Sequence, residues 1–369
     1  MKNHCHVCKS NLVEKFPIYN NFSLSTSDCK PINLTFQVVL CDDCNTVQKM
    51  INLEWEEIVK KIYSSYTIYY QSEGLEQSVF IEGLPIPRSK RIIEGVMQNY
   101  HIPMEGKILD IGCGNGSFLR NFHKVRPNFS LYGSEISDRD IKEISSIPNF
   151  EKLWCCQPHK ISGKYEIISM IHLLEHVISP ISFLKEVRKK LSTNGIIIIE
   201  VPNYRKNPFD LIIADHATHF SVDSLHHIVQ RSGYEVIWSS DSFIPKEITL
   251  IARKSDVINV LDANDERNKL VTSLQWLLKM RDEAKRIAMN GPVGIFGSSI
   301  AATWIFTELE GNVAFFVDED PNRIGRTHLG RPIISPAEVP DNVKVIIPAP
   351  EPIKKEIEKK LREISNTTH

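Results

Sequence analysis

Lys107-Ile-Leu-Asp-Ile-Gly-Cys-Gly-Asn-Gly116 sets the architecture of this 369-residue chain. A short aliphatic run ends in alternating glycines and leads directly into an apolar helix start, Ser117-Phe-Leu119. Glycines let the backbone turn sharply and approach a ligand that a Cβ atom would exclude. The stretch therefore predicts a strand, a ligand-binding turn and a helix, which form the repeating unit of a parallel α/β sheet.

Two carboxylates accompany this turn. Asp110 stands just before the first glycine, and Glu135 ends the next strand-like run, Leu131-Tyr-Gly-Ser-Glu135. A carboxylate at the position of Glu135 can accept hydrogen bonds from a ribose diol. The spacing G-x-G-x-G differs from the G-x-G-x-x-G of dinucleotide-binding enzymes, and the absence of a Walker lysine after it excludes a triphosphate cradle.

The chain divides into four segments around this turn. Strand-like and helical patterns alternate until about Lys254, and a second, shorter α/β pattern follows Gly291. The segment between them has Leu270, Leu274 and Leu277 at helical spacing, which predicts one long connecting helix. The alternative, a coiled coil that binds a partner, is disfavoured because the segment lacks sustained heptads. We expect an N-terminal lobe over 1–75, a core over 76–258, a connector over 259–290 and a C-terminal α/β lobe over 291–369.

Composition limits the partners and the compartment. Lys and Arg total 44 against 45 Asp and Glu, which argues against nucleic acid or an acidic membrane surface as a partner. The longest aliphatic run, Ile196 to Ile199, is too short to cross a bilayer. The N-terminal residues lack the apolar region of a secretion signal, so we expect a soluble, cytoplasmic protein with reduced cysteines.

Two C-x-x-C pairs, Cys5 with Cys8 and Cys41 with Cys44, predict a zinc site. Four thiolates close the coordination shell, whereas a catalytic zinc keeps one position open, so this metal is expected to be structural. His4 and His6 flank Cys5 and could replace one ligand.

From about Lys107 to Lys254 the sequence resembles the class I S-adenosylmethionine-dependent methyltransferases. Beyond the glycine turn, the resemblance rests on Tyr165–His176, Leu191–Asn203 and His219–Leu225. It implies a Rossmann-like core with a seven-stranded, mostly parallel sheet and S-adenosylmethionine as cofactor. The residues predicted to bind the cofactor are Asp110, Gly112, Cys113, Gly114 and Gly116, with Glu135 on the ribose. His172 lies where the chain lines the methyl end and could contact the cofactor or the substrate.

Histidines are the candidates for proton transfer. Asp215-His216 lies beyond the fifth strand, at the carboxyl edge where open α/β sheets bind ligands. A histidine beside a carboxylate can act as a general base, although capping or packing before the next helix is the alternative. His176 repeats a Leu-Glu-His sequence that is common in these enzymes and is expected to pack.

The order of zinc lobe, methyltransferase core and short α/β lobe resembles the zinc-containing sugar C-methyltransferases of deoxysugar biosynthesis. C-terminal segments that match are Gly294–Ser298, Phe316–Asn322 and Pro332–Glu338. The family methylates a carbon next to the keto group of a nucleotide-linked sugar. Its Tyr-His-Glu-His motif reads here Ile213-Ala-Asp215-His216, so the base and the acid are kept and the tyrosine is lost. A second family tyrosine falls among Tyr66, Tyr69 and Tyr70, with Tyr70 as the candidate catalytic residue.

The sequence thus predicts a methyltransferase for a nucleotide-linked sugar or a similar activated small molecule, with His216 as the general base. Because Ile213 replaces the tyrosine, an O- or N-methyltransferase on a glycan precursor or other small molecule is the alternative. An inactive assembly partner with the same fold is a third possibility, against which the intact glycine turn argues.

Overall fold

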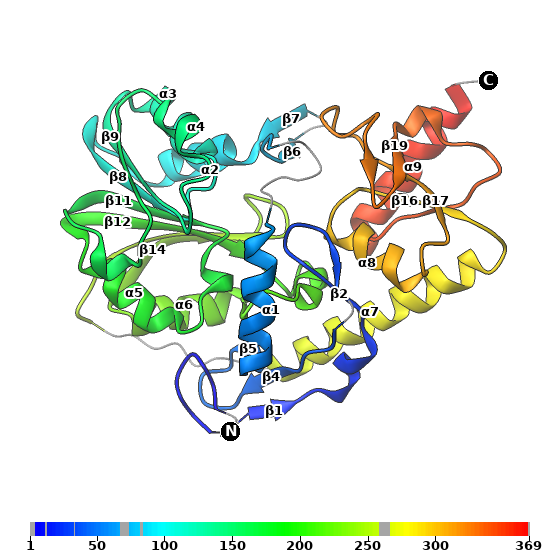
Figure 1. The fold of residues 1–369 in the computed structure, drawn as a ribbon, viewed down its shortest axis with the longest axis horizontal. Coiled ribbons are helices and arrows are strands. Elements are labelled where there is room, and N and C mark those ends of the chain that lie inside the picture. Colours follow the sequence, from blue (N-terminus) through cyan, green and yellow to red (C-terminus); the bar gives the residue numbers. More distant parts are fainter. Residues whose placement is uncertain are drawn as a thin grey trace.

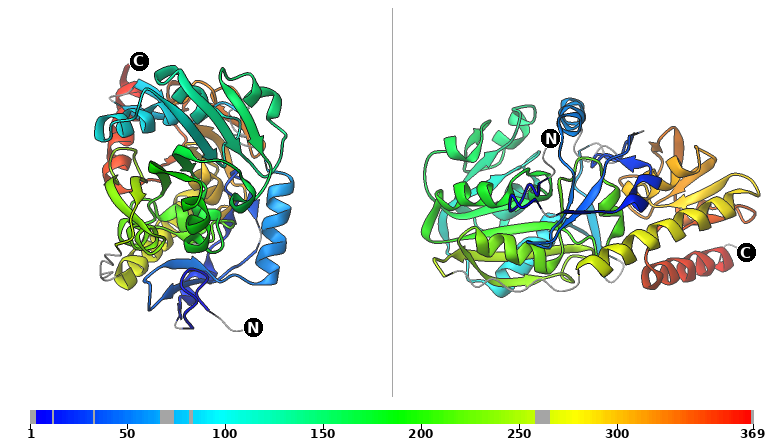
Figure 2. Two further views of the ribbon diagram at one scale, coloured as in Figure 1. Left: turned by 90° about the vertical axis from the view of Figure 1, so that its left-hand side faces the viewer. Right: turned by 90° about the horizontal axis from the view of Figure 1, so that it is seen from below.

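The computed structural model describes residues 4–11, 13–32, 34–66, 74–81, 84–257 and 266–367. Sheets of seven, five and four strands mark the core, the C-terminal lobe and the N-terminal lobe. In Figure 1 and in the right-hand view of Figure 2, the N-terminal lobe lies between the other two.

The core sheet has the strand order β10-β9-β8-β11-β12-β15-β14. Its first five strands run parallel, and β15 lies antiparallel between β12 and β14. The predicted seven-stranded, mostly parallel sheet is therefore confirmed. The strands are β8 (Glu105–Ile111), β9 (Asn128–Ser134), β10 (Phe150–Trp154), β11 (Tyr165–Ile171), β12 (Leu191–Pro202), β14 (Tyr234–Ser240) and β15 (Glu247–Lys254).

Helices cover both faces of this sheet, which is why Ile196 to Ile199 of β12 are all buried. On one face, α2 and α3 pack with Ile196 and Ile198; on the other, α5 and α6 pack with Ile197 and Ile199. The helices of the core are α2 (Arg88–Asn99), α3 (Ser117–Val125), α4 (Ile141–Ser145), α5 (Pro180–Arg188) and α6 (Val222–Arg231), with 3-10 helices η3 (Pro158–Lys160), η4 (Leu174–His176) and η5 (Pro208–Ile212). A hairpin of β6 (Ser78–Ile81) and β7 (Leu84–Pro87) precedes α2.

The C-terminal lobe is a second α/β unit, with the strand order β18-β19-β17-β16-β20. Only β18 runs antiparallel to its neighbour. Its elements are β16 (Val293–Phe296), α8 (Ile300–Glu308), β17 (Val313–Val317), β18 (Thr327–His328), β19 (Arg331–Ile334), η6 (Pro336–Glu338), β20 (Val345–Ile346) and α9 (Glu351–Thr367). The connector is a 23-residue helix, α7 (Glu266–Ala288), which packs against η5 and α8.

The N-terminal lobe is completed by the core. Its sheet has the order β1-β4-β5-β13, and β13 (Thr218–His219) comes from the loop that carries His216. The lobe's other elements are β1 (Val13–Lys15), η1 (Pro17–Asn21), β2 (Leu24–Ser25), β3 (Pro31–Ile32), β4 (Val38–Cys41), β5 (Val47–Lys49) and α1 (Leu53–Ser64).

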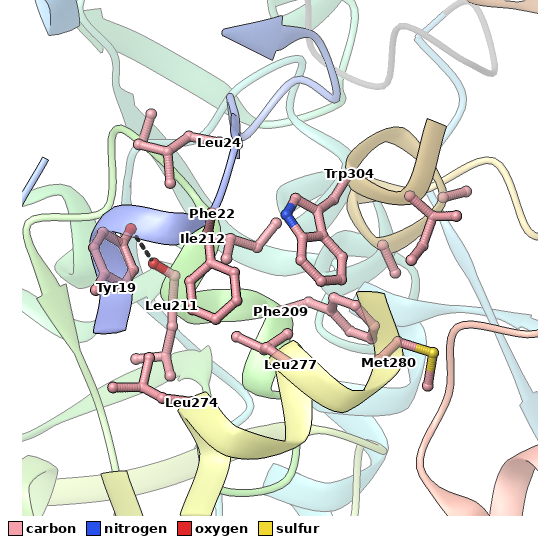
Figure 3. Packing of buried hydrophobic residues seen from close by; sticks show 14 of the residues in the cluster. Tyr19, Phe22, Leu24, Phe209, Leu211, Ile212, Leu274, Leu277, Met280 and Trp304 are labelled. Atoms are coloured by element: carbon pink, nitrogen blue, oxygen red, sulfur yellow. Dashed lines mark hydrogen bonds between the residues drawn. The ribbon is translucent and has the colours of Figure 1, made fainter. Parts of the chain in front are cut away.

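One apolar cluster joins the parts of the chain that the sequence analysis separates. Figure 3 shows Phe22 of the N-terminal lobe, Phe209 of η5, Leu277 of α7 and Trp304 of α8 packed together. The Trp304 ring forms edge-to-face pairs with Phe22 and Phe209, with ring centroids 6.0 and 5.8 Å apart. Packing therefore continues across the expected segment boundaries at 75 and 290.

No helix in the described ranges is both long and apolar enough to cross a membrane.

Candidate active site

The glycine turn follows β8 at the carboxyl edge of the core sheet. Gly112, Gly114 and Gly116 have φ angles of 76°, 53° and 82°, a backbone region that other residues rarely adopt. A Cβ on Gly116 would also lie 2.8 Å from Cδ1 of Ile147. Glycine is therefore required by the backbone of the turn itself.

Asp110 and Glu135 lie on either side of this turn. Glu135 accepts hydrogen bonds from the amides of Gly114 (3.0 Å) and Ile136 (2.7 Å). Asp110 is buried and accepts a 2.7 Å bond from Ser169 Oγ. Burial raises the pKa of Asp110 to about 7 against the opposing effect of Ser169, and the Glu135 carboxylate adds to the rise. Two acidic groups beside an open turn fit a cationic ligand such as S-adenosylmethionine.

Cys113 is placed differently from its neighbours in the turn. Its side chain is buried, and its Sγ lies 2.7 Å from the position that a Cβ on Gly133 would occupy. Its amide donates to the Ser134 carbonyl at 3.1 Å. The amide and the thiol of Cys113 thus both face β9. Cys113 can therefore contribute to the predicted cofactor site only through the shape of the turn.

His172 follows β11 and has a φ of 51°, an uncommon conformation for a non-glycine residue. Its Nδ1 lies 3.2 Å from Glu175 Oε1, and its Nε2 lies 2.6 Å from Arg88 Nη1. Burial lowers the pKa of His172, but the nearby carboxylates outweigh burial and raise it to about 10, so the Nδ1–H donates to Glu175. Glu200 and Glu247 approach Nε2 to 3.5 and 3.8 Å. The ring is held in a polar cluster at the carboxyl edge of the sheet.

His216 forms a buried pair with Asp210 of η5, at 2.6 Å between Nδ1 and Oδ1. The sequence analysis associates His216 with its neighbour Asp215, and the structure corrects this pairing. Asp215 accepts hydrogen bonds from the amide (2.8 Å) and Oγ (2.5 Å) of Ser27 and lies 3.5 Å from His176 Nδ1. The carboxylate that contacts the ring stands six residues upstream, in η5.

The second oxygen of Asp210 continues the network. Its Oδ2 lies 2.7 Å from His219 Nδ1, and His219 Nε2 lies 2.9 Å from Lys49 Nζ. Lys49 also donates to the Leu211 carbonyl at 2.7 Å. All of these side chains are buried.

His176 packs against His216, and Tyr63 contacts His176 in turn; neither residue is predicted from the sequence to be catalytic. Tyr63 OH lies 2.9 Å from His176 Nδ1, and the His176 and His216 rings lie edge to face with centroids 4.6 Å apart. Tyr66 packs against Tyr63, whereas Tyr69 and Tyr70 lie outside the described residues. The sequence does place Tyr63 three residues before Tyr66, close to the tyrosines that it singles out.

The four predicted metal ligands lie together. Sγ of Cys5 is 3.6 Å from Sγ of Cys44, Sγ of Cys8 is 3.5 Å from Sγ of Cys41, and all four atoms lie within 4.8 Å of one another. Tetrahedral zinc with Zn–S bonds of about 2.3 Å places its sulfurs about 3.8 Å apart. The donor set therefore fits a closed zinc site.

Residues next to this sulfur cluster also contact the loop that carries His216. Gln48 Nε2 donates to Cys5 Sγ at 3.0 Å. His6 points away from the sulfurs, since its Nε2 lies 2.9 Å from Thr218 Oγ1. His6 is therefore placed to join the cysteine lobe to β13.

A cavity of about 250 Å³ lies between the core and the C-terminal lobe. Its lining includes Gln77 and Lys246 from the core and Ser298, Asp318 and Arg323 from the lobe. Gln77 accepts a 2.8 Å bond from Arg88, which contacts His172, so the cavity adjoins that polar cluster. A cavity of about 370 Å³ opens near the other ends of β11 and β12, around Tyr100 and Asn194, away from the glycine turn.

The core is similar in sequence to known proteins. Residues 88–238 match the methyltransferase domain family. A ubiquinone biosynthesis O-methyltransferase of Hydrogenovibrio crunogenus is 23% identical over 174 residues, which are 44% of this chain and 67% of that protein. A protein of the same description from a Caulobacter species is 27% identical over 117 residues, which are 28% of this chain and 44% of that protein.

Among solved structures, an S-adenosylmethionine-dependent methyltransferase of Clostridium acetobutylicum is similar at a TM-score of 0.38. It is 13% identical, and the similarity covers 55% of this chain and 98% of that one. The family match includes the glycine turn, the five parallel strands and the His216 loop described above. The sequence of residues 88–238 is thus similar to that of the methyltransferase domain family.

Proposed function

We propose that this protein transfers a methyl group to a nucleotide-linked sugar or a similar activated small molecule, with His216 as the general base. The observation that carries the proposal is the buried pair of His216 Nδ1 and Asp210 Oδ1 at 2.6 Å. With its Nδ1–H donated to Asp210, the ring keeps a lone pair on Nε2 that can take a proton from the acceptor.

Asp110, Glu135 and the glycine turn would hold S-adenosylmethionine, which supplies an electrophilic methyl group when bound. Gly112, Gly114 and Gly116 keep the turn free of side chains, and Glu135 would accept from the ribose. His172 follows the neighbouring strand β11, and we propose that it borders the methyl end of the site. The protein's main task is then to align the acceptor and exclude water.

The surroundings of His216 suit a base. Burial lowers the pKa of its imidazole, but Asp210 outweighs burial, and Glu175 and Asp215 add to the effect, so the net shift is upward. In the reaction, His216 Nε2 would take the proton as the acceptor atom bonds to the methyl carbon. We propose that the Tyr63 hydroxyl donates to the acceptor oxygen in place of the family tyrosine that Ile213 replaces.

A sugar nucleotide is proposed as the substrate because of the cavity between the core and the C-terminal lobe. Its lining combines the donors Arg323, Ser298 and Lys246 with three carboxylates, and this mixture of donors and acceptors fits a hydroxyl-rich molecule. The carboxylates belong to Asp318, Glu319 and Asp320. The order of cysteine lobe, core and C-terminal α/β lobe also supports this substrate class.

Oxygen is the alternative acceptor atom. The two curated relatives are named as O-methyltransferases, and an oxygen nucleophile would need only the His216 base. Ile213 in place of a tyrosine favours the same reaction.

We also propose that the four-cysteine site holds structural zinc, and that the protein acts in the cytoplasm, where its thiols stay reduced. The zinc would take no part in the reaction, because four thiolate ligands leave no open coordination position for a substrate.

Substitution of His216 tests the mechanism. Incubation with isotopically labelled S-adenosylmethionine and a panel of nucleotide-linked keto sugars and phenols should yield a methylated product. His216→Ala should lower turnover by about 100-fold or more while cofactor binding is retained. His159→Ala, at an exposed site, is the matched control. Unchanged turnover in His216→Ala would remove His216 from the mechanism.

The position of the label on carbon, oxygen or nitrogen decides the acceptor atom. If the protein binds the cofactor but methylates none of these acceptors, an inactive assembly partner becomes the better interpretation.

A further inference from the structure

The loop that carries His216 is built on the N-terminal lobe. The amide of Lys49 donates to the Ala217 carbonyl at 2.9 Å, and the Ala214 amide donates to the Ser25 carbonyl at 2.8 Å. Trp55 Nε1 donates to the Ala214 carbonyl at 3.0 Å. The loop is thus held on both sides of His216 by residues of the cysteine lobe.

A chain of buried side chains runs from the same lobe to the base. It passes from Lys49 Nζ to His219 Nε2 (2.9 Å), from His219 Nδ1 to Asp210 Oδ2 (2.7 Å), and from Asp210 Oδ1 to His216 Nδ1 (2.6 Å). Lys49 and His219 are 0% exposed, Asp210 1% and His216 3%. The links of this chain are therefore shielded from bulk solvent.

The order of donors along this chain fixes the protonation of each ring. Burial opposes ionisation of Asp210, but His219 and His216 outweigh burial and keep its pKa well below the usual value, so its carboxylate can only accept. His219 therefore carries its proton on Nδ1 and accepts from Lys49 at Nε2. That Nδ1–H donates to one oxygen of Asp210, and the other oxygen then accepts the Nδ1–H of His216. The lone pair of His216 is left on Nε2, the nitrogen that a general base needs.

We propose that Lys49 and His219 are positioning residues for methyl transfer: through Asp210 they hold His216 in the tautomer with its lone pair on Nε2. The inference rests on the proposed role of His216 as the base. It gives the cysteine lobe a part in the reaction, because β5 of that lobe supplies Lys49 and pairs with the strand that supplies His219.

Charges around the chain support this assignment. Burial lowers the pKa of Lys49 to about 7 although Asp210 and Asp215 oppose it, and burial together with Lys49 lowers the pKa of His219 to about 4. His219 therefore stays neutral, and the Asp210 charge acts on His216. The groups that face His216 are Asp210 of η5, His219 of β13, Glu175 and His176 of η4, and Asp215 of its own loop.

Nuclear magnetic resonance of the full chain with ¹⁵N-labelled histidine tests the inference without any substrate. The wild-type spectrum should show His216 and His219 protonated on Nδ1 at neutral pH. Lys49→Met keeps the length of the side chain but removes its charge and its donor. In this variant the pKa of His219 should rise by about one unit or more, since a neighbouring cation is lost. The pKa of His216 should fall, because a charged His219 competes for Asp210.

Two further variants keep the test decisive. Lys49→Gln retains a neutral N–H donor and should give intermediate titrations, and it carries the test if Lys49→Met does not fold. Lys15→Met, at an exposed position of β1 in the same sheet, should leave both titrations unchanged. The inference is overturned if wild-type His216 carries its proton on Nε2, or if both histidines titrate normally in a folded Lys49 variant.

The same spectra separate this inference from the proposed function. One outcome is that the pKa values of His216 and His219 change in the Lys49 variants while His216→Ala still transfers methyl groups at the wild-type rate. In that case the chain of contacts exists and another residue is the base. If His216→Ala is inactive and the titrations do not move, the base stands and Lys49 has no positioning role.

Discussion

At the scale of single residues, we predict that Asp110 makes the binding of S-adenosylmethionine depend on pH. Its buried carboxyl has a pKa of about 7, so a large part of it is protonated at neutral pH before a ligand binds. A cationic ligand favours the ionised form and lowers this pKa, so binding must release a proton. Affinity for S-adenosylmethionine should therefore rise between about pH 6 and pH 8.

Calorimetry in buffers of different ionisation enthalpy measures this proton directly. The wild type should release a fraction of a proton at pH 7, and Asp110→Asn should release none. Asp256→Asn, at an exposed site, should behave as the wild type. Proton uptake, or an affinity that does not change with pH, would contradict this account of Asp110.

The residues of the turn were predictable from sequence because their chemistry is local. Asp110, Gly112 and Glu135 lie within one strand-turn-helix unit and the start of the next, where spacing alone fixes the geometry. The partner of His216 was not predictable in this way. Adjacent residues in an extended loop point in different directions, and Asp210 reaches the ring only through the 3-10 helix η5.

At the scale of secondary structure elements, the sulfur cluster anchors β4, β5 and, through them, β13. Cys41→Ser should remove one metal ligand and lower the zinc content, because the remaining thiols no longer close the shell. We expect a loss of about 3 kcal/mol or more in the free energy of unfolding. Elemental analysis and thermal unfolding measure both effects.

Cys155→Ser, which alters an exposed cysteine, is the matched control and should leave both quantities unchanged. Full zinc content in Cys41→Ser, or wild-type protein that folds normally without metal, would count against the structural site.

Sequence patterns located most of these elements but could not give their long-range pairing. The apolar runs of β8, β11 and β12 are long enough to be recognised as buried strands. β13 has two residues and no pattern of its own, and it is a strand only because β5, some 170 positions away, pairs with it. The contact between the cysteine lobe and the His216 loop therefore had no local signal.

At the scale of the whole molecule, the shared apolar cluster makes the N-terminal lobe, α7 and the C-terminal lobe one packing unit. Trp304→Ala should therefore destabilise both lobes together, by about 3–5 kcal/mol, because a fully buried indole leaves a large void. Limited proteolysis and thermal unfolding should show both lobes opening at the same lower temperature.

Leu53→Ala, at a side chain that is 67% exposed, should change the stability by less than about 0.5 kcal/mol. A Trp304→Ala protein in which the C-terminal lobe alone becomes sensitive to protease would show instead that the lobes fold independently. The expected boundaries at residues 75 and 290 mark changes in sequence pattern, and patterning cannot reveal which apolar faces later pack on one another.

Calorimetric titration of S-adenosylmethionine into the wild type, Glu135→Ala and the exposed control Glu151→Ala tests the cofactor site on which the whole account depends. Loss of charged hydrogen bonds worth about 1.5–3 kcal/mol should weaken binding about 10- to 100-fold in Glu135→Ala and leave the control unchanged. An affinity that Glu135→Ala does not diminish, or a wild type that binds no cofactor, would contradict the account.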